Sequence, residues 1–339
     1  MSQVSVIIPN WNGRRWLPDC LDAIAGQTRA PAEVIVVDNG SADGSVEYVK
    51  AEHPEVSVIQ LGRNTGFAHA ANRGIAAATS AFVALINTDV VLEPDWVERC
   101  VRVLSADDRA AAVATKMLQL ANPEEVYDAG DILRRDGACE QRGRFARDDG
   151  RYDEAGEIFG ACAAAALYRR DAVLALGGFD ERFFAYLEDV DLALRLRLAG
   201  WRCRYEPAVA LHAGESSSRN LRGGHMFLVQ RNTLLLVARW FPLRWLPLVC
   251  YRQTGWAWHA ARERRLATHL RATAAALPLV RDAVRERRRS RRRTVVSIAK
   301  VIQARPIRGL AAGGHPAATA ATWNGSSQKA PRQQPGPVV

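Results

Sequence analysis

The 339-residue sequence predicts an α/β fold with a mostly parallel sheet, followed by a basic helical extension. Short apolar runs alternate with helical patterns over residues 1–120, which is typical of βαβ units. These runs are almost continuously apolar, as expected of strands that are covered on both faces. Residues 1–218 hold 23 Lys and Arg against 33 Asp and Glu, a net charge of −10, whereas residues 219–339 hold 23 against 3, a net charge of +20. An acidic body therefore precedes a basic end.

The first hundred residues are predicted to form the nucleotide-binding half of this fold. Predicted strands span Val4–Ile8, Val34–Val37, Val56–Leu61 and Phe82–Ile86. Helical spacing covers Trp16–Ile24, Gly44–Val49, Phe67–Ala78 and Asp95–Leu104. No G-x-G-x-x-G segment follows any of these strands, which argues against an oxidoreductase that binds a dinucleotide.

The pattern weakens between residues 119 and 158, where polar, glycine-bearing segments predict loops and short strands that line a substrate cleft. Order returns with a predicted strand over Ile158–Tyr168, a helix over Arg170–Leu176, a helix that begins at the acidic residues 188–191 and stops at Gly200, and a strand over Arg202–Leu211. His212 follows the last strand directly.

An apolar stretch over Leu234–Cys250 raises the question of a membrane span. A span needs about 20 apolar residues, and an arginine at its centre costs about 2.5–3.5 kcal/mol. The stretch has seventeen residues and contains Arg239, Pro242, Arg244 and Pro247. We therefore predict a helical hairpin that lies at a membrane interface and does not cross the bilayer.

Three regions follow from these patterns. We expect a catalytic domain over residues 1–218, a basic amphipathic helical region that associates with a membrane over residues 219–293, and a largely disordered tail over residues 294–339. Arg285–Arg293 holds seven arginines and one glutamate. Such a tract suits a polyanionic partner, which is either a membrane surface or a nucleic acid.

Six cysteines lie far apart, at positions 20, 100, 139, 162, 203 and 250, and no C-x-x-C pair occurs. This spacing is unlike zinc and redox motifs and lacks the density of a secreted disulfide scaffold, so we expect reduced thiols. Met1 leads into the first predicted strand without a basic segment or a long apolar stretch. We expect a cytoplasmic protein that associates peripherally with the inner face of the cytoplasmic membrane.

Two carboxylates stand where predicted strands end, which is the edge at which open α/β sheets bind ligands. Asp38 is placed to accept a donor group of a nucleobase or ribose, although Asp-Asn-Gly-Ser is also a common turn and helix cap. Asp89 is a natural ligand for a Mg²⁺ or Mn²⁺ ion that bridges it to a diphosphate. The alternative for Asp89 is a capped turn before the helix that starts at Asp95.

Three more carboxylates, Glu188, Asp189 and Asp191, open a predicted helix behind the aromatic segment 179–186. The helix N-terminus favours ionised carboxylates, so one of them can accept a proton, and the aromatic side chains would wall a sugar pocket. Simple complementation of the helix dipole is the alternative. His212 is suited to contact a metal or a phosphate, although a lone histidine is more often structural.

Taken together, six ordered segments resemble the inverting, nucleotide-sugar-dependent glycosyltransferases of family 2, and within them the rhamnosyltransferase-like branch of bacterial polysaccharide assembly. The matching segments lie between residues 4 and 232 and comprise Val4–Gly13, Val36–Gly44, Asn64–Ala68 with Asn72 and Gly74, Leu85–Asp89, Gly177–Leu192 and His212. Arg231 and Asn232 also fit the family's pattern, without an assigned role. The resemblance implies a GT-A fold with a Rossmann-like, mostly parallel sheet.

The resemblance also implies roles for single residues. Donor contacts would come from Asp38 at the pyrimidine base and from Pro9, Asn10, Gly66, Phe67, Asn72, Asn87 and Thr88. Asp89 and His212 would hold the divalent metal, Mn²⁺ or Mg²⁺, and Asn87 in place of the first carboxylate of the D-x-D motif implies weak or substrate-dependent binding. Asp189 would be the general base, while Glu188 and Asp191 would support the acceptor or orient the loop.

The branch makes dTDP-rhamnose the leading donor, a UDP-sugar the alternative, and a polyprenyl-diphosphate-linked saccharide the acceptor. A nucleic-acid partner is not expected, because the arginine tract lacks interleaved aromatic residues and follows an acidic body. An anionic membrane surface explains the tract better, since each basic residue near it contributes about 1 kcal/mol. The retained carboxylates argue against an inactive scaffold, and the lack of a Q-x-x-R-W segment argues against a processive synthase.

Overall fold

The structure is a computed structural model that describes residues 3–214, 224–291 and 295–302. The tail expected over residues 294–339 lies outside the described residues apart from residues 295–302. Arg292 and Arg293 of the arginine tract also lie outside them.

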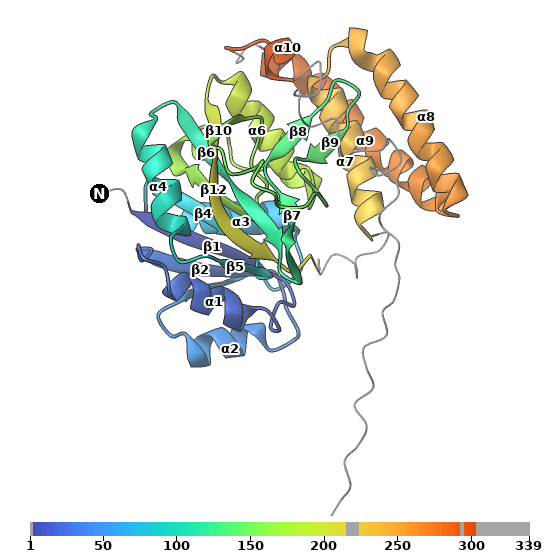
Figure 1. The fold of residues 1–339 in the computed structure, drawn as a ribbon. Helices are drawn as coiled ribbons and strands as arrows, with labels where there is room; N and C mark the ends of the chain where they lie inside the picture. The colour runs from blue at the N-terminus through green and yellow to red at the C-terminus, as the bar shows by residue number, and fades with distance from the viewer. Residues whose placement is uncertain (1–2, 215–223, 292–294, 303–339) are drawn as a thin grey trace, which may run out of the picture. The chain divides into compact units, whose positions relative to one another are not determined.

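Within the described ranges, ten strands form one mixed sheet (Figure 1). Its order is β10-β12-β6-β11-β4-β1-β2-β3, with β5 paired to β12 and β7 paired to β6. The strands are β1 (Val4–Asn10), β2 (Glu33–Asp38), β3 (Ser57–Gln60), β4 (Phe82–Ile86), β5 (Val90–Leu92), β6 (Ala110–Gln119), β7 (Asn122–Asp128), β10 (Gly156–Ile158), β11 (Ala165–Arg169) and β12 (Arg202–His212). Two short strands, β8 (Asp131–Leu133) and β9 (Cys139–Gln141), pair separately.

One half of this sheet is parallel throughout. β1 pairs in parallel with β2 and β4, and β2 pairs in parallel with β3. β11 then lies antiparallel between β4 and β6, and β6 pairs in parallel with β12. The predicted α/β fold with a mostly parallel sheet is confirmed.

Sequence periodicity located the parallel strands better than the centre of the sheet. All four strands predicted in the first hundred residues are present, and short strands occupy the segment 119–158 as expected. The ten-residue β6 was not predicted, because its alanine-rich sequence carries little of the β-branched signal that marks strands. The strand predicted over Ile158–Tyr168 is wrong over residues 159–164, because the chain leaves β10 at Ile158 and returns to the sheet only at Ala165.

Helices cover both faces of the parallel half. The helices of the body are α1 (Leu17–Ala25), α2 (Ser45–Glu52), α3 (Phe67–Ala77), α4 (Trp96–Ala106), α5 (Arg170–Ala175) and α6 (Glu188–Leu198), with a 3-10 turn η1 (Glu181–Phe183). Val6 and Ile8 of β1 share a core with α1 and α4. Ile7 points to the opposite face, as strand alternation requires, and α3 packs there. A Cβ at Gly74 of α3 would lie 2.3 Å from Ile7 Cγ2, so only glycine allows this approach.

The basic end folds into further helices, α7 (Gly224–Trp240), α8 (Leu246–Arg262), α9 (Leu266–Arg291) and α10 (Ile298–Val301), with a 3-10 turn η3 (Leu243–Trp245). Residues 241–245, which include Pro242, separate α7 from α8. Residues 257–284 are helical apart from the turn at residues 263–265, because α8 ends at Arg262 and α9 begins at Leu266. No helix in the ranges that the structure describes is both long and apolar enough to cross a bilayer.

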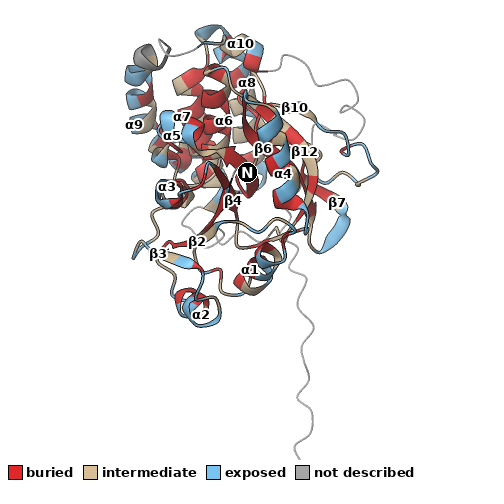
Figure 2. Cartoon of the chain, turned by 90° about the vertical axis from the view of Figure 1, so that its left-hand side faces the viewer, coloured by how far each residue is buried: buried red, intermediate tan, exposed pale blue. Residues whose placement is uncertain are grey.

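A second core joins α7 to the body. Val190 and Leu194 of α6 pack in one buried cluster with Leu235, Leu236 and Phe241 of the basic end. Buried residues therefore continue from the sheet through α6 into α7, whereas α8 buries little (Figure 2). The body and α7 share a core across the boundary that the charge pattern suggested near residue 218.

Candidate active site

The carboxyl ends of β1 and β2 bring Asn10 and Asp38 together. The parallel register places the two residues opposite each other, and the Asn10 amide nitrogen donates to Asp38 Oδ1 at 2.9 Å. Asp38 Oδ2 accepts the backbone N–H groups of Gly40 and Ser41, both at 3.1 Å. The turn that was the alternative for Asp38 is thus present, and its contacts hold a buried carboxylate at the ligand-binding edge of the sheet.

Asn10 also carries an unpaired acceptor. Its Oδ1 is buried and has no hydrogen-bond partner among the described residues. A Cβ at Gly13 would lie 2.4 Å from this oxygen and 2.8 Å from Thr88 Oγ1, so glycine lets the chain after β1 approach the chain after β4. A buried acceptor without a partner is costly, and an N–H group of a bound ligand would satisfy it.

An amide network joins β2 to the start of α3. Asn39 Nδ2 donates to the carbonyl oxygen of Gly66 at 3.1 Å. Gly66 has a φ of +90°, and a Cβ there would lie 2.5 Å from the carbonyl oxygen of Phe184. The ring of Phe67 meets the ring of Phe179 edge-on, with centroids 6.2 Å apart. Gly66 and Phe67 therefore face the aromatic segment that precedes the acidic helix.

Asn72 of α3 holds the chain that leads to this segment. Its Oδ1 accepts the Phe179 N–H at 2.8 Å, and its Nδ2 donates to the Phe179 carbonyl at 2.9 Å and to Glu181 Oε1 at 3.0 Å. Both N–H bonds of the amide are thus used inside the protein. These contacts are those of a residue that positions a loop, whereas the sequence led us to expect a contact with the donor.

Asp89 and His212 meet where β5 pairs with β12. The antiparallel register places His212 opposite Val90, and His212 Nε2 lies 3.7 Å from Asp89 Oδ1. Both side chains are buried. The Gly214 N–H donates to His212 Nδ1 at 2.7 Å, so the proton of the neutral imidazole is assigned to Nε2, on the side of Asp89.

His212 belongs to a stack that the sequence analysis missed. Its ring stacks on the ring of Tyr127, with the ring centroids 3.9 Å apart. The guanidinium of Arg144 lies 4.0 Å from the centre of the Tyr127 ring. Burial, and then the charge of Arg144, lowers the pKa of His212 to about 3. No local pattern distinguishes Arg144 from its neighbours Arg142 and Arg147, so only the fold could select it.

The donor groups at this point fit one mode of divalent metal binding. The structure carries no ligands, and no cluster of three or more His, Cys, Asp or Glu with metal-binding geometry occurs in the described ranges. Asp89 and a neutral His212 supply a carboxylate and an imidazole. Sites of this kind use one or two protein ligands and complete the shell with substrate phosphates and water. Ligation through His212 Nε2 would require its proton to move to Nδ1 and the Gly214 contact to open.

Four carboxyl groups gather at the start of α6. Asp189 is partly buried, and its Oδ2 accepts the Ala163 N–H at 3.2 Å. Glu188 and Asp131 are only 5% and 7% exposed, and each has one oxygen without a partner among the described residues. Asp128 is fully buried, and its carboxylate accepts the Gly130 N–H and the Gln141 amide. Asp128 and Asp131 were not among the expected site residues.

Burial shifts the pKa values of these carboxyl groups. It raises the pKa of Glu188 and of Asp131 well above the usual range, and the charge of Asp189 raises both further. Burial also raises the pKa of Asp189, which its bonds to backbone N–H groups oppose. Burial raises the pKa of Asp128 to about 7. Among Glu188, Asp131 and Asp189, Asp189 is the one whose carboxylate backbone N–H groups favour, which makes it the best placed to accept a proton.

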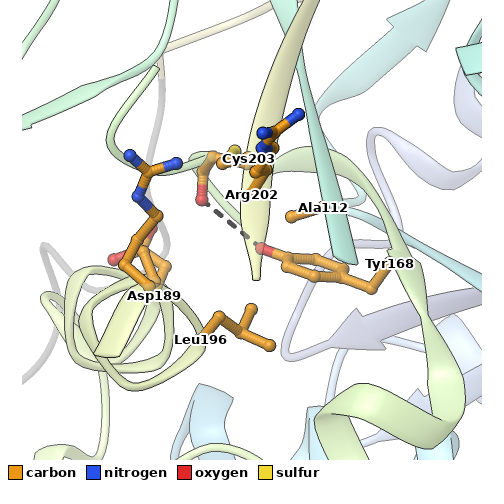
Figure 3. A pocket seen from close by; sticks show the side chains of 9 residues that line it. Ala112, Tyr168, Asp189, Leu196, Arg202 and Cys203 are labelled. Atoms are coloured by element: carbon orange, nitrogen blue, oxygen red, sulfur yellow. Dashed lines mark hydrogen bonds between the residues drawn. The ribbon is translucent and has the colours of Figure 1, made fainter. Parts of the chain in front are cut away.

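A small cavity lies behind Asp189, between α6, β11 and β12 (Figure 3). Tyr168, Leu196 and Cys203 line it, and the Tyr168 hydroxyl donates to the Ala161 carbonyl at 3.4 Å. Its volume is about 10 Å³, enough for at most one water molecule. A sugar cannot enter it, so a saccharide would approach Asp189 from another side.

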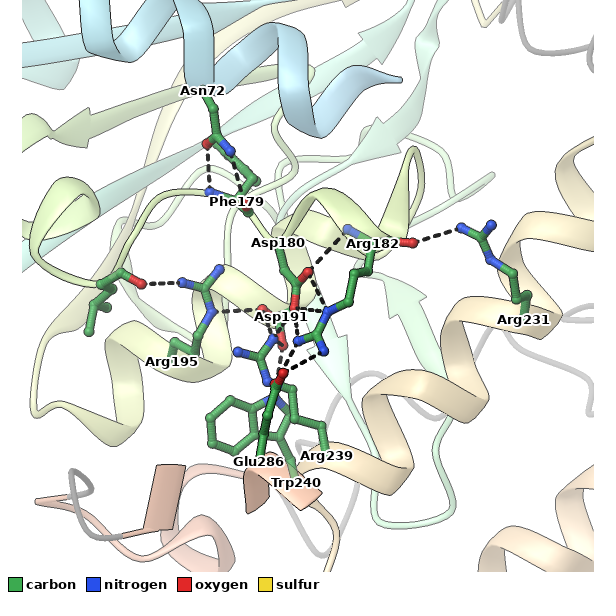
Figure 4. A network of polar contacts seen from close by, with 11 residues as sticks. Asn72, Phe179, Asp180, Arg182, Asp191, Arg195, Arg231, Arg239, Trp240 and Glu286 are labelled. Atoms are coloured by element: carbon green, nitrogen blue, oxygen red, sulfur yellow. Dashed lines mark hydrogen bonds and ion pairs between the residues drawn. The ribbon is translucent and has the colours of Figure 1, made fainter. Parts of the chain in front are cut away.

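Asp191 has a different environment from Asp189. It is fully buried, and its oxygens accept from Arg195 Nε at 2.7 Å, from Trp240 Nε1 at 2.7 Å and from Arg239 at 3.2 Å (Figure 4). Residues two apart on a helix do not face the same way. Asp191 thus ties α6 to α7, and these contacts agree with orientation of the loop better than with acceptor contact.

Comparison with known proteins identifies the family. Residues 5–177 match the family described as Glycosyl transferase family 2. The chain belongs to glycosyltransferase family 2. This family-2 transferase moves a sugar from a nucleotide-linked donor, and the predicted enzyme class is confirmed.

The family-2 transferase is similar to several characterised proteins. It is 30% identical over 259 residues to the N-acetylglucosaminyl-diphospho-decaprenol L-rhamnosyltransferase of Mycobacterium tuberculosis, covering 66% of this chain and 82% of the relative. It is 32% identical over 227 residues to the pre-mycofactocin glycosyltransferase of the same species, covering 64% of this chain and 44% of that one.

Two solved structures share the fold of the transferase. GalNAc-T7 with UDP, GalNAc and Mn²⁺ superposes with a TM-score of 0.58 at 16% identity, over 71% of this chain and 48% of the other. The mannosyltransferase PcManGT of Pyrobaculum calidifontis with GDP-Man and Mn²⁺ gives a TM-score of 0.50 at 21% identity, over 82% and 75%. The implied GT-A fold is confirmed.

Proposed function

We propose that this transferase moves L-rhamnose from dTDP-rhamnose to a hydroxyl group of a saccharide linked to polyprenyl diphosphate, with inversion at the anomeric carbon. The mycobacterial relative supports this substrate pair, because its name gives a rhamnosyl transfer to a decaprenol-linked sugar and the match covers 82% of its length. A UDP-sugar is the alternative donor. The proposal depends most on one observation, the Asp189 carboxylate that accepts the Ala163 and Val190 N–H groups beside Glu188 and Asp131, whose pKa values burial raises.

Asp189 acts as the general base in this proposal. It takes the proton of the acceptor hydroxyl while that oxygen attacks the anomeric carbon and the bond to the diphosphate breaks. A single displacement of this kind inverts the anomeric configuration and needs no nucleophile from the enzyme. Glu188 and Asp131, held neutral, can donate hydrogen bonds to the acceptor and add no charge that would repel it.

The strand edge binds the donor in the same proposal. Asp38 or the free Oδ1 of Asn10 accepts the single N–H group of the thymine or uracil base. Asp89, with His212, would hold a divalent cation, which when bound neutralises the departing diphosphate. Arg144, stacked on Tyr127 beside His212, adds positive charge on the same side.

The α8–α9 hairpin is the proposed contact with an anionic membrane. Large apolar side chains are exposed along it, among them Tyr251 at 82%, Trp258 at 63% and Leu277 at 60%. Twelve arginines lie between residues 244 and 291, on these two helices, on the connection between them and on the 3-10 turn η3 before them. Exposed aromatic and aliphatic groups among arginines are typical of helices that lie in the interface of a bilayer.

Two experiments test the substrates. Calorimetric titration with dTDP and with UDP, each in the presence of Mn²⁺, should give tighter binding of dTDP; tighter binding of UDP would select the alternative. Transfer is then assayed with radiolabelled dTDP-rhamnose and N-acetylglucosaminyl-diphosphopolyprenol. A lipid-linked disaccharide of inverted configuration supports the proposal, and the absence of product from this acceptor with a bound donor refutes the proposed acceptor.

Flotation tests the membrane contact. The full-length protein is mixed with vesicles of phosphatidylglycerol or of phosphatidylcholine, and co-flotation only with the anionic vesicles is expected. Trp258→Ser should weaken flotation, whereas Phe145→Ser, which replaces an exposed aromatic residue on the body, should not. Equal flotation with both lipids, or equal loss in both variants, would refute the assignment of this surface.

A further inference from the structure

The chain that delivers Asp189 has an unusual backbone. Phe184, Tyr186 and Leu187 all have left-handed φ values, of 64°, 70° and 67°. Residues other than glycine rarely adopt such values. Three of them within four consecutive residues persist only when surrounding contacts hold the backbone in place. Leu187 is also the residue that precedes α6, so the shape of the 183–187 loop sets where Glu188 and Asp189 begin.

Asn232 of α7 binds this loop from one side. It is fully buried, and its Nδ2 lies 2.9 Å from the carbonyl oxygen of Phe183, 2.8 Å from that of Ala185 and 2.6 Å from that of Tyr186. Two protons serve three acceptors, so the amide sits at the centre of the turn that these carbonyls form. A side chain from another helix thus gathers three backbone oxygens of one short loop.

Arg231 adds to the same contact. Its guanidinium donates to the carbonyl oxygen of Arg182 at 3.1 Å (Figure 4) and to that of Phe183 at 2.7 Å. It also donates through Nε to Asn232 Oδ1 at 3.0 Å, which orients the amide with its nitrogen toward the loop. The pair therefore works as one unit, with Arg231 fixing the amide and Asn232 fixing the loop.

The opposite side of the loop contacts the start of α3, in the parallel half of the fold. The Phe184 carbonyl accepts the Ala68 N–H at 3.1 Å, and the Phe184 ring lies where a Cβ on Gly66 would stand. The 183–187 loop is thus held between the N-terminus of α3, which adjoins the Asn39 network, and α7, which belongs to the basic end. A change in the contacts between α7 and the loop would move Asp189 relative to the carboxyl ends of β1 and β2.

We propose that Asn232 is a positioning residue for sugar transfer, which holds the 183–187 loop in the left-handed shape that places Asp189. The proposal rests on the proposed function, because it assigns the chemistry to Asp189. It also gives the basic end a part in catalysis beyond attachment, since the helix that carries Asn232 leads into the proposed membrane hairpin.

The test compares Asn232→Leu with Thr233→Val in the full-length protein. Leucine has the same branched side-chain skeleton as asparagine and cannot donate a hydrogen bond. Thr233 is the matched control, because it is equally buried on α7 and its hydroxyl bonds only to the Val229 carbonyl of its own helix. With dTDP-rhamnose as donor, kcat of Asn232→Leu should fall on the order of 100-fold, as expected of a misplaced reacting group. The donor KM and the affinity for dTDP with Mn²⁺ should match the control.

Hydrogen exchange gives a second measurement that needs no substrate. Amides of residues 183–189 should exchange faster in Asn232→Leu than in Thr233→Val, while the β1 and β4 amides stay protected in both. If Asn232→Leu fails to fold, Arg231→Met is used instead and should show a smaller fall in kcat with the same unchanged donor KM.

The two proposals fail in different ways. A folded Asn232→Leu with the kcat and the exchange rates of the control overturns the positioning role, as does an Arg231→Met variant with wild-type kcat where Asn232→Leu does not fold. An equal loss of donor affinity and kcat also overturns it, because that result indicates general damage. A wild-type protein that transfers sugar from neither dTDP-rhamnose nor a UDP-sugar overturns the proposed function, and the exchange rates still decide whether Asn232 holds the loop.

Discussion

His212 Nε2 lies 3.7 Å from Asp89 Oδ1, at the point where β12 pairs with β5. Neither residue is positioned by its own segment alone, because the contact depends on a pairing between distant strands. Burial keeps the pKa of His212 near 3, so the imidazole stays neutral over the working range of the enzyme. The pair therefore combines one carboxyl group with one neutral imidazole.

Asp89→Asn removes the only full negative charge of this pair and leaves its size unchanged. We expect the affinity for dTDP in the presence of Mn²⁺ to fall roughly 10- to 100-fold, in line with the loss of a contact to a charged group. The affinity measured without metal should change little. Calorimetry with and without Mn²⁺ checks this, and an unaltered dependence on Mn²⁺ would exclude Asp89 as the metal ligand.

Asp189→Asn removes the proton acceptor with minimal change in shape. General base catalysis contributes about 10²- to 10⁴-fold, so sugar transfer should fall by this factor. Binding of dTDP with Mn²⁺ should stay at the wild-type level, because Asp189 is not among the residues proposed to bind the base. Substantial residual transfer would show that another group takes the proton.

Arg144→Gln tests the cation that the stack with Tyr127 presents. Loss of a charged contact to the diphosphate should weaken binding of dTDP-rhamnose roughly tenfold, with a smaller effect on thymidine, which lacks the phosphates. Arg147→Gln is the control, since its side chain is 78% exposed and pairs only with Glu124 at the surface. Equal effects of the two substitutions would indicate a general electrostatic contribution and no specific contact.

The pKa of Asp128 predicts a dependence of stability on pH. The folded-state pKa is about 7 and the ordinary value is 3.8, so between these values the folded protein holds a proton that the unfolded chain has released. The free energy of unfolding therefore falls as pH rises from about 4 to about 7, by at most about 1.4 kcal/mol per pH unit from this group. Asp131, Glu188 and Asp189 act in the same direction.

Asp128→Asn should make that decline shallower. The neutral amide does not titrate, so the variant should gain stability relative to the wild type at pH 8 compared with pH 5. Urea unfolding at both pH values measures the difference. A variant that follows the wild-type slope would show that Asp128 ionises near its ordinary pKa.

Asp191→Asn tests the buried contacts between α6 and α7. Removing one member of a buried charge network costs about 3–5 kcal/mol, because Arg195 and Arg239 lose their shared partner. Asp149→Asn is the control, since Asp149 pairs with Arg151 at the surface and exposed pairs contribute little to stability. Urea unfolding compares the variants, and equal small effects would argue against the network as a structural link.

The parallel half of the fold and its polar strand ends were predictable because their signals are local. Alternating apolar runs mark β1, β2 and β4, and carboxylates that follow such runs reach the carboxyl edge whatever the rest of the chain does. The rest of the sheet was less visible. β6 is alanine-rich, and its place between β11 and β12 depends on pairings with segments far along the chain.

The acidic helix start shows the same division within a few residues. Its composition marked Glu188, Asp189 and Asp191 as one group, because three carboxylates stand in four positions. Packing gives them different partners. Asp189 accepts hydrogen bonds from backbone N–H groups, and Asp191 accepts them from the side chains of Arg195 and Trp240. The helix geometry that puts Asp189 and Asp191 on different sides is regular and predictable. The residues that contact each side come from other segments, and the local sequence does not predict them.

The charge arithmetic divided the chain near residue 218, and this division correctly marks where the composition changes. It does not mark a boundary between separate cores, because α7 shares a core with α6 and Asn232 donates hydrogen bonds to the loop before Asp189. Net charge reports on surfaces, and burial is set by which faces meet. The sequence alone therefore established the family, the strand edge and the candidate carboxylates, whereas the partners of those carboxylates depend on contacts between distant segments that only the folded chain brings within hydrogen-bond distance.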